Sequence, residues 1–244
     1  MVVNASAGRT GKLPTMRKVV IVRNSTGSLG RLAERLSASG VAWEEVHPLR
    51  GDPVPPADEI GTLVLMGGIM GAYETDTFPF LVDEMDAARL LVRKGRPVLG
   101  ICLGSQLLAA ALGGRAYPAD RPEVGAVASE LTPAGMRHPV VSQVGGRKVF
   151  AMHQDTFDLP PDSELLASSD RFPQAFAHGS ALAIQFHPET HNDEAGQWAE
   201  DSSDMVERAG SSLEEFEAGM EDAGQELAEG AYGLFDAWIE GLDG

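Results

Sequence analysis

The only cysteine of the chain, Cys102, lies between two glycines in residues 100–104, Gly-Ile-Cys-Leu-Gly. The apolar residues 97–101 predict a buried strand, and residues 105–112, rich in Leu and Ala, predict a helix. A cysteine in this turn matches the thiol form of a nucleophile elbow, where a side chain at either glycine would clash. The helix dipole there favours thiolate over thiol. The pattern predicts a nucleophile, although a buried structural cysteine on an ordinary turn fits the same local sequence.

A histidine that can serve as general base follows far downstream. Residues 181–186 form an apolar run that predicts a strand, and this run leads directly into His187, with Glu189 two residues further on. A histidine at a strand end can take the thiol proton while a nearby carboxylate holds its ring. Alone, the His-Pro-Glu sequence would fit a surface loop. Together with Cys102 it predicts a nucleophile, a base and an acid.

Three segments together resemble the class I, triad-type glutamine amidotransferases, and most closely their stand-alone, GMP-synthase-like members. The segments are residues 66–68, 100–106 and 185–189, and they occur in the family's order. The resemblance spans about residues 17–189. It implies an α/β fold with a doubly wound, mainly parallel, flavodoxin-like sheet in three layers. It also implies that glutamine is the substrate and that ammonia passes to a synthase, which would here be a separate chain.

The glycines of residues 67 and 68 end another predicted strand, at the same sheet edge as the cysteine. Glycines there let backbone N–H groups approach a substrate oxygen, and an acyl-transfer site needs such donors for the developing oxyanion. The predicted donors are the N–H groups of Gly67 or Gly68 and of Leu103, the residue after the nucleophile. A plain Gly-Gly turn is the alternative.

The resemblance also implies residues of the glutamine pocket. Gln106, four residues after the cysteine, matches a family position that contacts substrate glutamine, although a glutamine on a helix surface would look the same. His153, Gln154 and Asp155 follow a predicted strand and correspond to pocket or supporting residues. A loop histidine with ordinary partners is the alternative for His153. No Cys/His cluster has the spacing of a zinc site, and we expect neither metal nor cofactor.

The elements that must position these residues alternate between strand and helix in the first half of the chain. Strands are predicted at residues 18–22, 41–46, 62–66 and 97–101, with helices at residues 28–39 and 78–92, which favours a mainly parallel sheet. Short strands at residues 124–131, 140–144, 148–152, 164–169 and 174–177, with a turn at residues 132–135, indicate a small antiparallel extension on the sheet edge.

Charge divides the chain into segments. Residues 192–244 contain 16 acidic residues and one basic residue, whereas the remainder has 20 acidic and 18 basic residues. An apolar stripe through residues 213–238 predicts a C-terminal helical pair packed on the sheet, with acidic residues on its other face; a docking element for a basic partner is the alternative. We therefore expect a leader at residues 1–16, disordered or left from cloning, an amidotransferase domain at residues 17–191, and this helical segment at residues 192–244.

Composition excludes several classes of protein. The acidic C-terminal segment would repel phosphates, so we expect no nucleic-acid binding. The sequence has no apolar run long enough for a membrane span and no secretory signal. A single cysteine forms no internal disulfide, which suits a reducing cytoplasm, where we expect the protein.

Two other functions fit the same residues. A γ-glutamyl hydrolase or peptidase that acts on another γ-glutamyl amide would use the same triad, and only the pocket would distinguish it. A non-catalytic binding or regulatory module on the same fold would usually lack the nucleophile or the base. Here Cys102, His187 and Glu189 are all present, which favours an enzyme.

Overall fold

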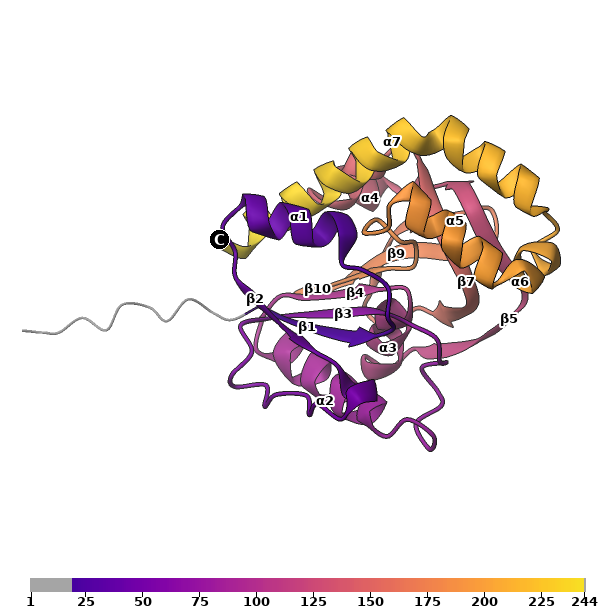
Figure 1. Ribbon diagram of the computed structural model, residues 1–244. Coiled ribbons are helices and arrows are strands. Elements are labelled where there is room, and N and C mark those ends of the chain that lie inside the picture. Colours follow the sequence, from indigo (N-terminus) through magenta and orange to yellow (C-terminus); the bar gives the residue numbers. More distant parts are fainter. Residues whose placement is uncertain (1–18, 244) are drawn as a thin grey trace, which may run out of the picture.

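A sheet of parallel strands forms the centre of the molecule (Figure 1). The computed structural model describes residues 19–243, so the expected leader at residues 1–16 lies outside the described residues. Five neighbouring strands run parallel in the order β2 (Trp43–Val46), β1 (Val19–Asn24), β3 (Thr62–Gly68), β4 (Val98–Ile101) and β10 (Ala181–Ile184). Their carboxyl ends therefore meet at one edge, where such sheets bind ligands.

Antiparallel strands extend the sheet beyond β10. They are β9 (Pro173–His178), β8 (Glu164–Ser168) and β6 (Glu130–Leu131), in that order. A separate two-stranded antiparallel sheet consists of β5 (Arg115–Ala128) and β7 (Lys148–Asp158). The predicted α/β fold, a doubly wound, mainly parallel sheet with a small antiparallel extension, is confirmed.

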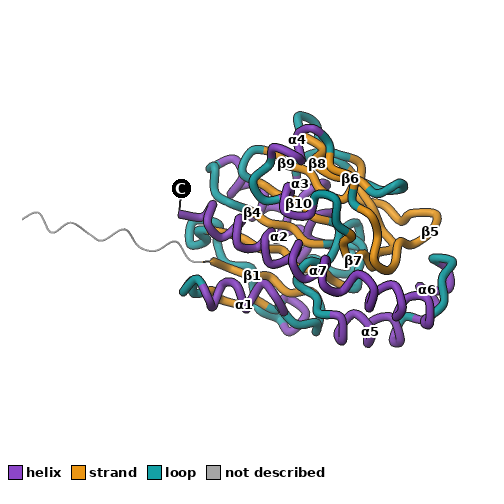
Figure 2. Tube along the Cα trace, turned by 90° about the horizontal axis from the view of Figure 1, so that it is seen from above, coloured by secondary structure: helices purple, strands orange, loops and turns teal. Residues whose placement is uncertain are grey.

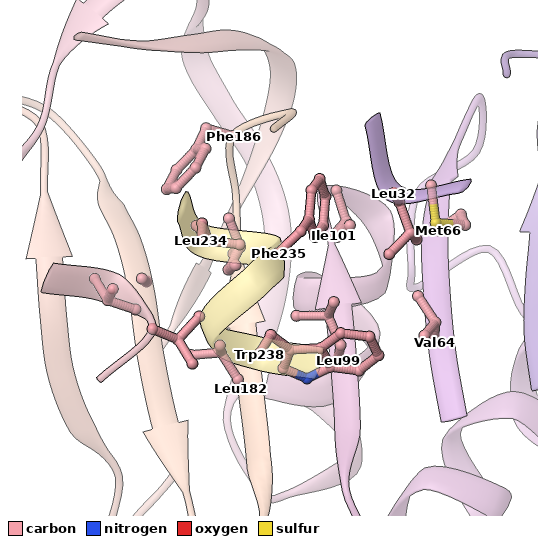
Figure 3. Close-up of a cluster of buried hydrophobic side chains, with 14 of the residues drawn as sticks. Leu32, Val64, Met66, Leu99, Ile101, Leu182, Phe186, Leu234, Phe235 and Trp238 are labelled. Carbon is pink, nitrogen blue, oxygen red and sulfur yellow. The ribbon is translucent and has the colours of Figure 1, made fainter. Parts of the chain in front are cut away.

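Helices cover both faces of the main sheet, which gives three layers (Figure 1). On one face α1 (Gly30–Ala38) and α7 (Leu213–Glu240) pack against apolar side chains of β1, β3, β4 and β10. Figure 3 shows Trp238 and Phe235 of α7 within this cluster, close to Leu99 and Ile101 of β4. On the other face α2 (Phe80–Arg93) and α3 (Leu103–Ala111) cover the alternate strand residues. Both faces of the central strands are therefore buried, which explains their continuous apolar sequence.

The C-terminal segment has three helices, α5 (Asn192–Asp201), α6 (Ser203–Arg208) and α7. Helix α7 is one continuous helix of 28 residues that begins with a capping box formed by Ser212 and Glu215. Its first half packs with α5 and α6 against Phe150 of β7, and its second half packs on the main sheet. Figure 2 shows α7 crossing the molecule, with α5 and α6 beside the β5–β7 sheet.

Some local expectations were wrong. Residues 140–144 form no strand, because Val141–Val144 is a short 3-10 helix that follows Pro139 and buries Val141 and Val144. The expected turn at residues 132–135 begins helix α4 (Pro133–Arg137), in which Thr132 Oγ1 accepts a hydrogen bond from Gly135 N at 3.1 Å and proline occupies the first turn. Two further 3-10 helices are Pro48–Arg50 and Gly241–Asp243.

Candidate active site

The elbow between β4 and α3 holds Cys102 in an unusual backbone conformation. Its φ of 51° and ψ of −109° lie in a region that residues with a side chain rarely adopt. The turn is fixed on both sides, since Cys102 N donates to Ile184 O at 2.8 Å and Cys102 O accepts from Ser105 Oγ at 2.6 Å. The strained turn places the thiol at the N-terminus of α3, at the carboxyl edge of the sheet.

The two flanking glycines are required by close packing. A Cβ on Gly104 would lie 2.0 Å from the carbonyl oxygen of Leu65 on β3, and a Cβ on Gly100 would lie 2.4 Å from Gly104 O. Both distances are far below van der Waals contact, so the first turn of α3 can approach β3 and β4 this closely only without these side chains.

The structure brings the three residues of the expected triad together. His187 follows β10, and its Nδ1 donates to Glu189 Oε1 at 2.8 Å. Its ring is also hydrogen-bonded to Cys102, and because Nδ1 is used by Glu189, Nε2 is the nitrogen available to the thiol. The backbone N–H of His187 donates to Phe150 O at 2.7 Å, and the ring of Trp198 packs edge-on against the imidazole at 5.2 Å between centroids.

The pKa of His187 is raised well above its ordinary value. Burial alone would lower this pKa, but the charges of Cys102 and Glu189 and the hydrogen bonds to both outweigh that effect. The imidazole is thus held as a cation beside the sulfur, which is the arrangement of an activated cysteine nucleophile.

Gly67 and Gly68 end β3 directly beside this group. A Cβ built on Gly67 would lie 3.1 Å from His187 Cε1 and 3.6 Å from Cys102 Cβ, so the backbone of Gly67 borders the space next to the sulfur. A Cβ on Gly68 would lie 2.4 Å from Leu103 Cδ2. Leu103 begins α3, so its N–H has no partner within the helix. The end of β3 and the first residue of α3 therefore lie beside the thiol.

A cleft of about 640 Å³ opens above the thiol. Cys102, Leu103, His187 and Glu189 line it together with segments that are far apart in sequence. These are Arg23 of β1 and residues 25–28 after it, residues 66–71, 73 and 74 at and beyond the end of β3, Gln106 of α3, residues 152–155 of β7, and Trp198, Asp201, Ser202 and Met205 of α5, α6 and their connection. The volume lies in the range of small-molecule sites.

The four expected pocket residues all line this cleft, but most of their polar atoms are already bonded. Gln106 Nε2 donates to Asp155 O at 3.1 Å and to Gln185 Oε1 at 3.3 Å. Gln154 Nε2 donates to Ala119 O at 2.8 Å, and Gln154 Oε1 accepts from Arg208.

His153 and the side chain of Asp155 have quite different surroundings. Both ring nitrogens of buried His153 face oxygen atoms, Asp155 O at 3.0 Å and Glu123 Oε2 at 3.1 Å. The Asp155 carboxyl accepts a hydrogen bond from Tyr73, which lies in the loop after β3. Burial chiefly raises the pKa of both groups, that of Tyr73 to about 12, and a nearby Glu74 adds to the effect.

Sequence reasoning did not find Tyr73, Trp198, Met205 or Glu123. The first three come from a loop and from helices outside the matched motifs, and only the tertiary structure brings them to the cleft. Glu123 carried a detectable signal, because it is a charged residue directly before the alternating apolar pattern of residues 124–131.

Within the described residues no group of three or more His, Cys, Asp or Glu side chains could hold a metal ion.

Comparison with known protein families places this site in context. Residues 31–201 match the family model described as glutamine amidotransferase class-I. The chain belongs to the class I glutamine amidotransferase family. The matched range contains the elbow, the histidine and glutamate after β10, and helix α5, whereas α6 and α7 lie beyond it.

Relatives of this amidotransferase include GMP synthases and a glutamine amidotransferase-like protein. It is 40% identical over 130 residues to a GMP synthase (glutamine-hydrolyzing) of Thermomicrobium roseum, a match that covers 52% of this chain and 23% of the relative. It is 32% identical over 184 residues to the glutamine amidotransferase-like protein YfeJ of Salmonella typhimurium, covering 70% of this chain and 76% of that one. The chain thus spans only about a quarter of the first relative's length.

Solved structures share the fold of this amidotransferase. A glutamine amidotransferase from Thermotoga maritima superimposes with a TM-score of 0.80 at 28% identity, covering 93% of this chain and 98% of that one. A second structure, from Methylobacillus flagellatus, has a TM-score of 0.82 at 23% identity and covers 93% and 95% of the two chains.

Among the described residues, no helix combines the length and apolar character needed to cross a bilayer.

Proposed function

We propose that this amidotransferase hydrolyses the side-chain amide of glutamine to glutamate and ammonia through Cys102, His187 and Glu189. The observation that carries the proposal is the hydrogen-bonded series of thiol, imidazole and carboxylate at the floor of the cleft. Membership of the class I family supports amide hydrolysis or transfer, and the GMP synthase of Thermomicrobium roseum is named as a glutamine-hydrolysing enzyme.

In the first half of the reaction the Cys102 thiolate attacks the amide carbon of glutamine. The carbonyl oxygen becomes an oxyanion, which the N–H groups of Leu103 and of Gly67 or Gly68 stabilise; loss of one such donor typically costs about 10²–10³ in rate. His187 then gives its Nε2 proton to the departing nitrogen, the C–N bond breaks, and ammonia leaves a γ-glutamyl thioester on Cys102.

In the second half a water molecule attacks the thioester while His187 takes one of its protons. The C–S bond breaks, glutamate leaves, and the thiolate and imidazolium are restored. Glu189 keeps Nδ1 protonated through both halves and so keeps Nε2 directed at the reacting atoms. The pocket residues Gln106, His153, Gln154 and Asp155 form the wall on the β7 side. No cofactor takes part.

The ammonia acceptor is proposed to be a separate synthase chain. The relatives named GMP synthase are about three times as long as the segment that matches this chain, or longer, which supports a synthase as the acceptor. Measuring ammonia release with and without cell extract, on the full chain, tests this, because an acceptor that orders the loop after β3 would raise the turnover of glutamine.

Release of glutamate and ammonia from L-glutamine, compared between the wild type and Cys102→Ser, tests the proposed reaction. We expect the rate of glutamate release by the variant to fall by more than about 10³-fold, because the hydroxyl is a far weaker nucleophile than the thiolate. A panel of γ-glutamyl amines run beside glutamine separates a glutaminase from a γ-glutamyl hydrolase. Unchanged glutamate release by the variant would rule out the mechanism.

A further inference from the structure

Glu123 is a buried carboxyl group outside the proposed catalytic triad. It lies on β5 opposite His153 of β7 in the antiparallel pair, and both side chains are almost completely excluded from solvent. Three side chains approach its two oxygens: His153 Nε2 at 3.1 Å, Ser169 Oγ at 2.6 Å and Gln174 Nε2 at 2.5 Å. It therefore connects β5, β7, β9 and the loop after β8.

Ser169 and Gln174 both donate hydrogen bonds to Glu123. Ser169 Oγ already accepts from the N–H groups of Arg171 and Phe172, so its own hydrogen goes to Glu123. The amide nitrogen of Gln174 can only donate. Burial would raise the pKa of Glu123, but the hydrogen bonds from His153, Ser169 and Gln174 lower it below its ordinary value.

The ring of His153 is held at both of its nitrogens. Its Nδ1 faces Asp155 O, a carbonyl oxygen that can only accept, so Nδ1 donates this hydrogen bond. Its Nε2 lies 3.1 Å from Glu123 Oε2, and the ring of Phe172 packs edge-on against the imidazole at 5.3 Å between centroids. The orientation of this buried ring is therefore fixed by its neighbours.

The backbone carbonyl group of Asp155 lies at the other end of this hydrogen-bond network. It accepts from His153 Nδ1 at 3.0 Å and from Gln106 Nε2 at 3.1 Å. Gln106 belongs to α3, the helix that begins after Cys102, and the carboxyl group of Asp155 lines the cleft. The network thus connects the helix of the nucleophile with the opposite wall of the cleft.

We propose that Glu123 is a positioning residue for the substrate: its hydrogen bond with His153 Nε2 holds the imidazole in place, and Nδ1 of the ring in turn fixes the Asp155 backbone and with it the β7 wall of the cleft. This inference rests on the proposed glutaminase function for its kinetic part only. The other titratable and charged groups near His153 are the carboxyl of Asp155, Arg171, whose guanidinium stacks on Phe172, and Arg208, which bonds Gln154.

The contact between Glu123 and His153 can be tested by NMR without any assay of activity. In the full chain labelled with ¹⁵N-histidine, His153→Asn assigns the ring-nitrogen signals of His153. In Glu123→Gln, which keeps the shape and removes the charge, we expect the Nε2 signal of His153 to move more than that of any other histidine. An Nε2 signal of His153 that does not move in Glu123→Gln would overturn the proposal whatever substrate the enzyme uses.

Kinetics test whether Glu123 acts through His153. We expect Glu123→Gln to raise KM for glutamine about tenfold with little change in kcat, because the wall of the cleft and not the triad is displaced. Glu130→Gln, at an exposed position on β6, is the matched control and should leave both constants unchanged.

A double-mutant cycle completes the test. If Glu123 acts only through His153, then Glu123→Gln adds no further rise in KM to a chain that already carries His153→Asn. Independent, additive effects of the two substitutions, or a loss confined to kcat, would contradict the assigned role.

Discussion

The imidazole of His187 lies between two acidic groups, the thiol of Cys102 and the carboxyl of Glu189, and all three side chains are buried. Because these neighbours raise the pKa of His187 despite its burial, the proton that a leaving ammonia needs is already on the ring at neutral pH. Glu189 is the only one of the two neighbours that can be altered without removing the nucleophile, and it therefore gives the sharpest test of this charge arrangement.

Replacing Glu189 by Gln should slow alkylation of Cys102. The neutral amide no longer stabilises the His187 cation, so the pKa of His187 falls and the positive charge that activates the sulfur is weakened. We expect the rate with iodoacetamide at pH 6.5 to fall about tenfold. Glu200→Gln, an exposed change on α5, should not alter the rate, and equal rates for wild type and Glu189→Gln would count against the arrangement.

Glu84 of α2 is a second buried carboxyl, and both of its oxygens accept from Asn24 Nδ2, at 3.0 and 2.9 Å. Burial raises its pKa to about 7, although the Asn24 hydrogen bonds oppose the rise. A raised pKa means that the folded chain binds this proton more tightly than the unfolded chain does. The resulting stabilisation is complete below pH 4.5 and is lost as the pH rises through 7.

The Glu84→Gln variant should therefore be more stable than the wild type at pH 8, with an upper limit of about 3 kcal/mol, and should gain little at pH 5. Guanidinium unfolding at both pH values measures the difference. The exposed variant Glu59→Gln should show no such dependence on pH. A loss of stability in Glu84→Gln at pH 8 would show that the buried carboxylate has a stabilising partner.

At the scale of elements, the elbow depends on how closely α3 approaches β3. Gly104→Ala places a methyl group where the Leu65 carbonyl oxygen lies, at 2.0 Å, and should cost about 1–3 kcal/mol or more in unfolding free energy together with most of the activity. Gly196→Ala on α5 is the matched control: nothing lies within 4 Å of its Cβ, so it should gain about 0.5–1 kcal/mol. Equal stability of the two variants would refute the packing argument.

The elements differ in how well their sequence predicts them. The strands at residues 62–66 and 97–101 were predicted correctly because they are buried on both faces and therefore apolar throughout. The prediction for residues 140–144 was wrong because a short run containing three valines is typical of a strand. In the structure, burial of Val141 and Val144 by a 3-10 helix outweighs that preference. The buried stripe of α7 was correctly placed, but its continuity through residues 213–240 was not predicted.

At the scale of the whole molecule, the cleft exists only when distant segments meet. Motif spacing gave Cys102, His187 and Glu189, since a turn and a strand end have local sequence signals. The contributions of Trp198 and Met205 had no such signal, because the approach of α5 and α6 to the triad is set by packing of α7 and β7. The family resemblance supplied the position of His153 but not its partner Glu123.

Because the cleft joins so many segments, its ligand should stabilise the entire chain. In Cys102→Ala, which cannot turn glutamine over, L-glutamine at 100 times its Kd should add about 2.7 kcal/mol to the unfolding free energy. A thermal shift that grows with L-glutamine, and is absent with D-glutamine, is the expected result. No shift at any concentration would show that glutamine does not bind the folded cleft.

The most direct test of the account is covalent capture of the nucleophile. The full chain, treated with a diazoketone analogue of glutamine, is examined by intact mass and peptide mapping. The account predicts one label per chain, on Cys102, which L-glutamine prevents and which Cys102→Ser abolishes. A chain that stays unlabelled, or a label on Cys102 that L-glutamine fails to prevent, would contradict it.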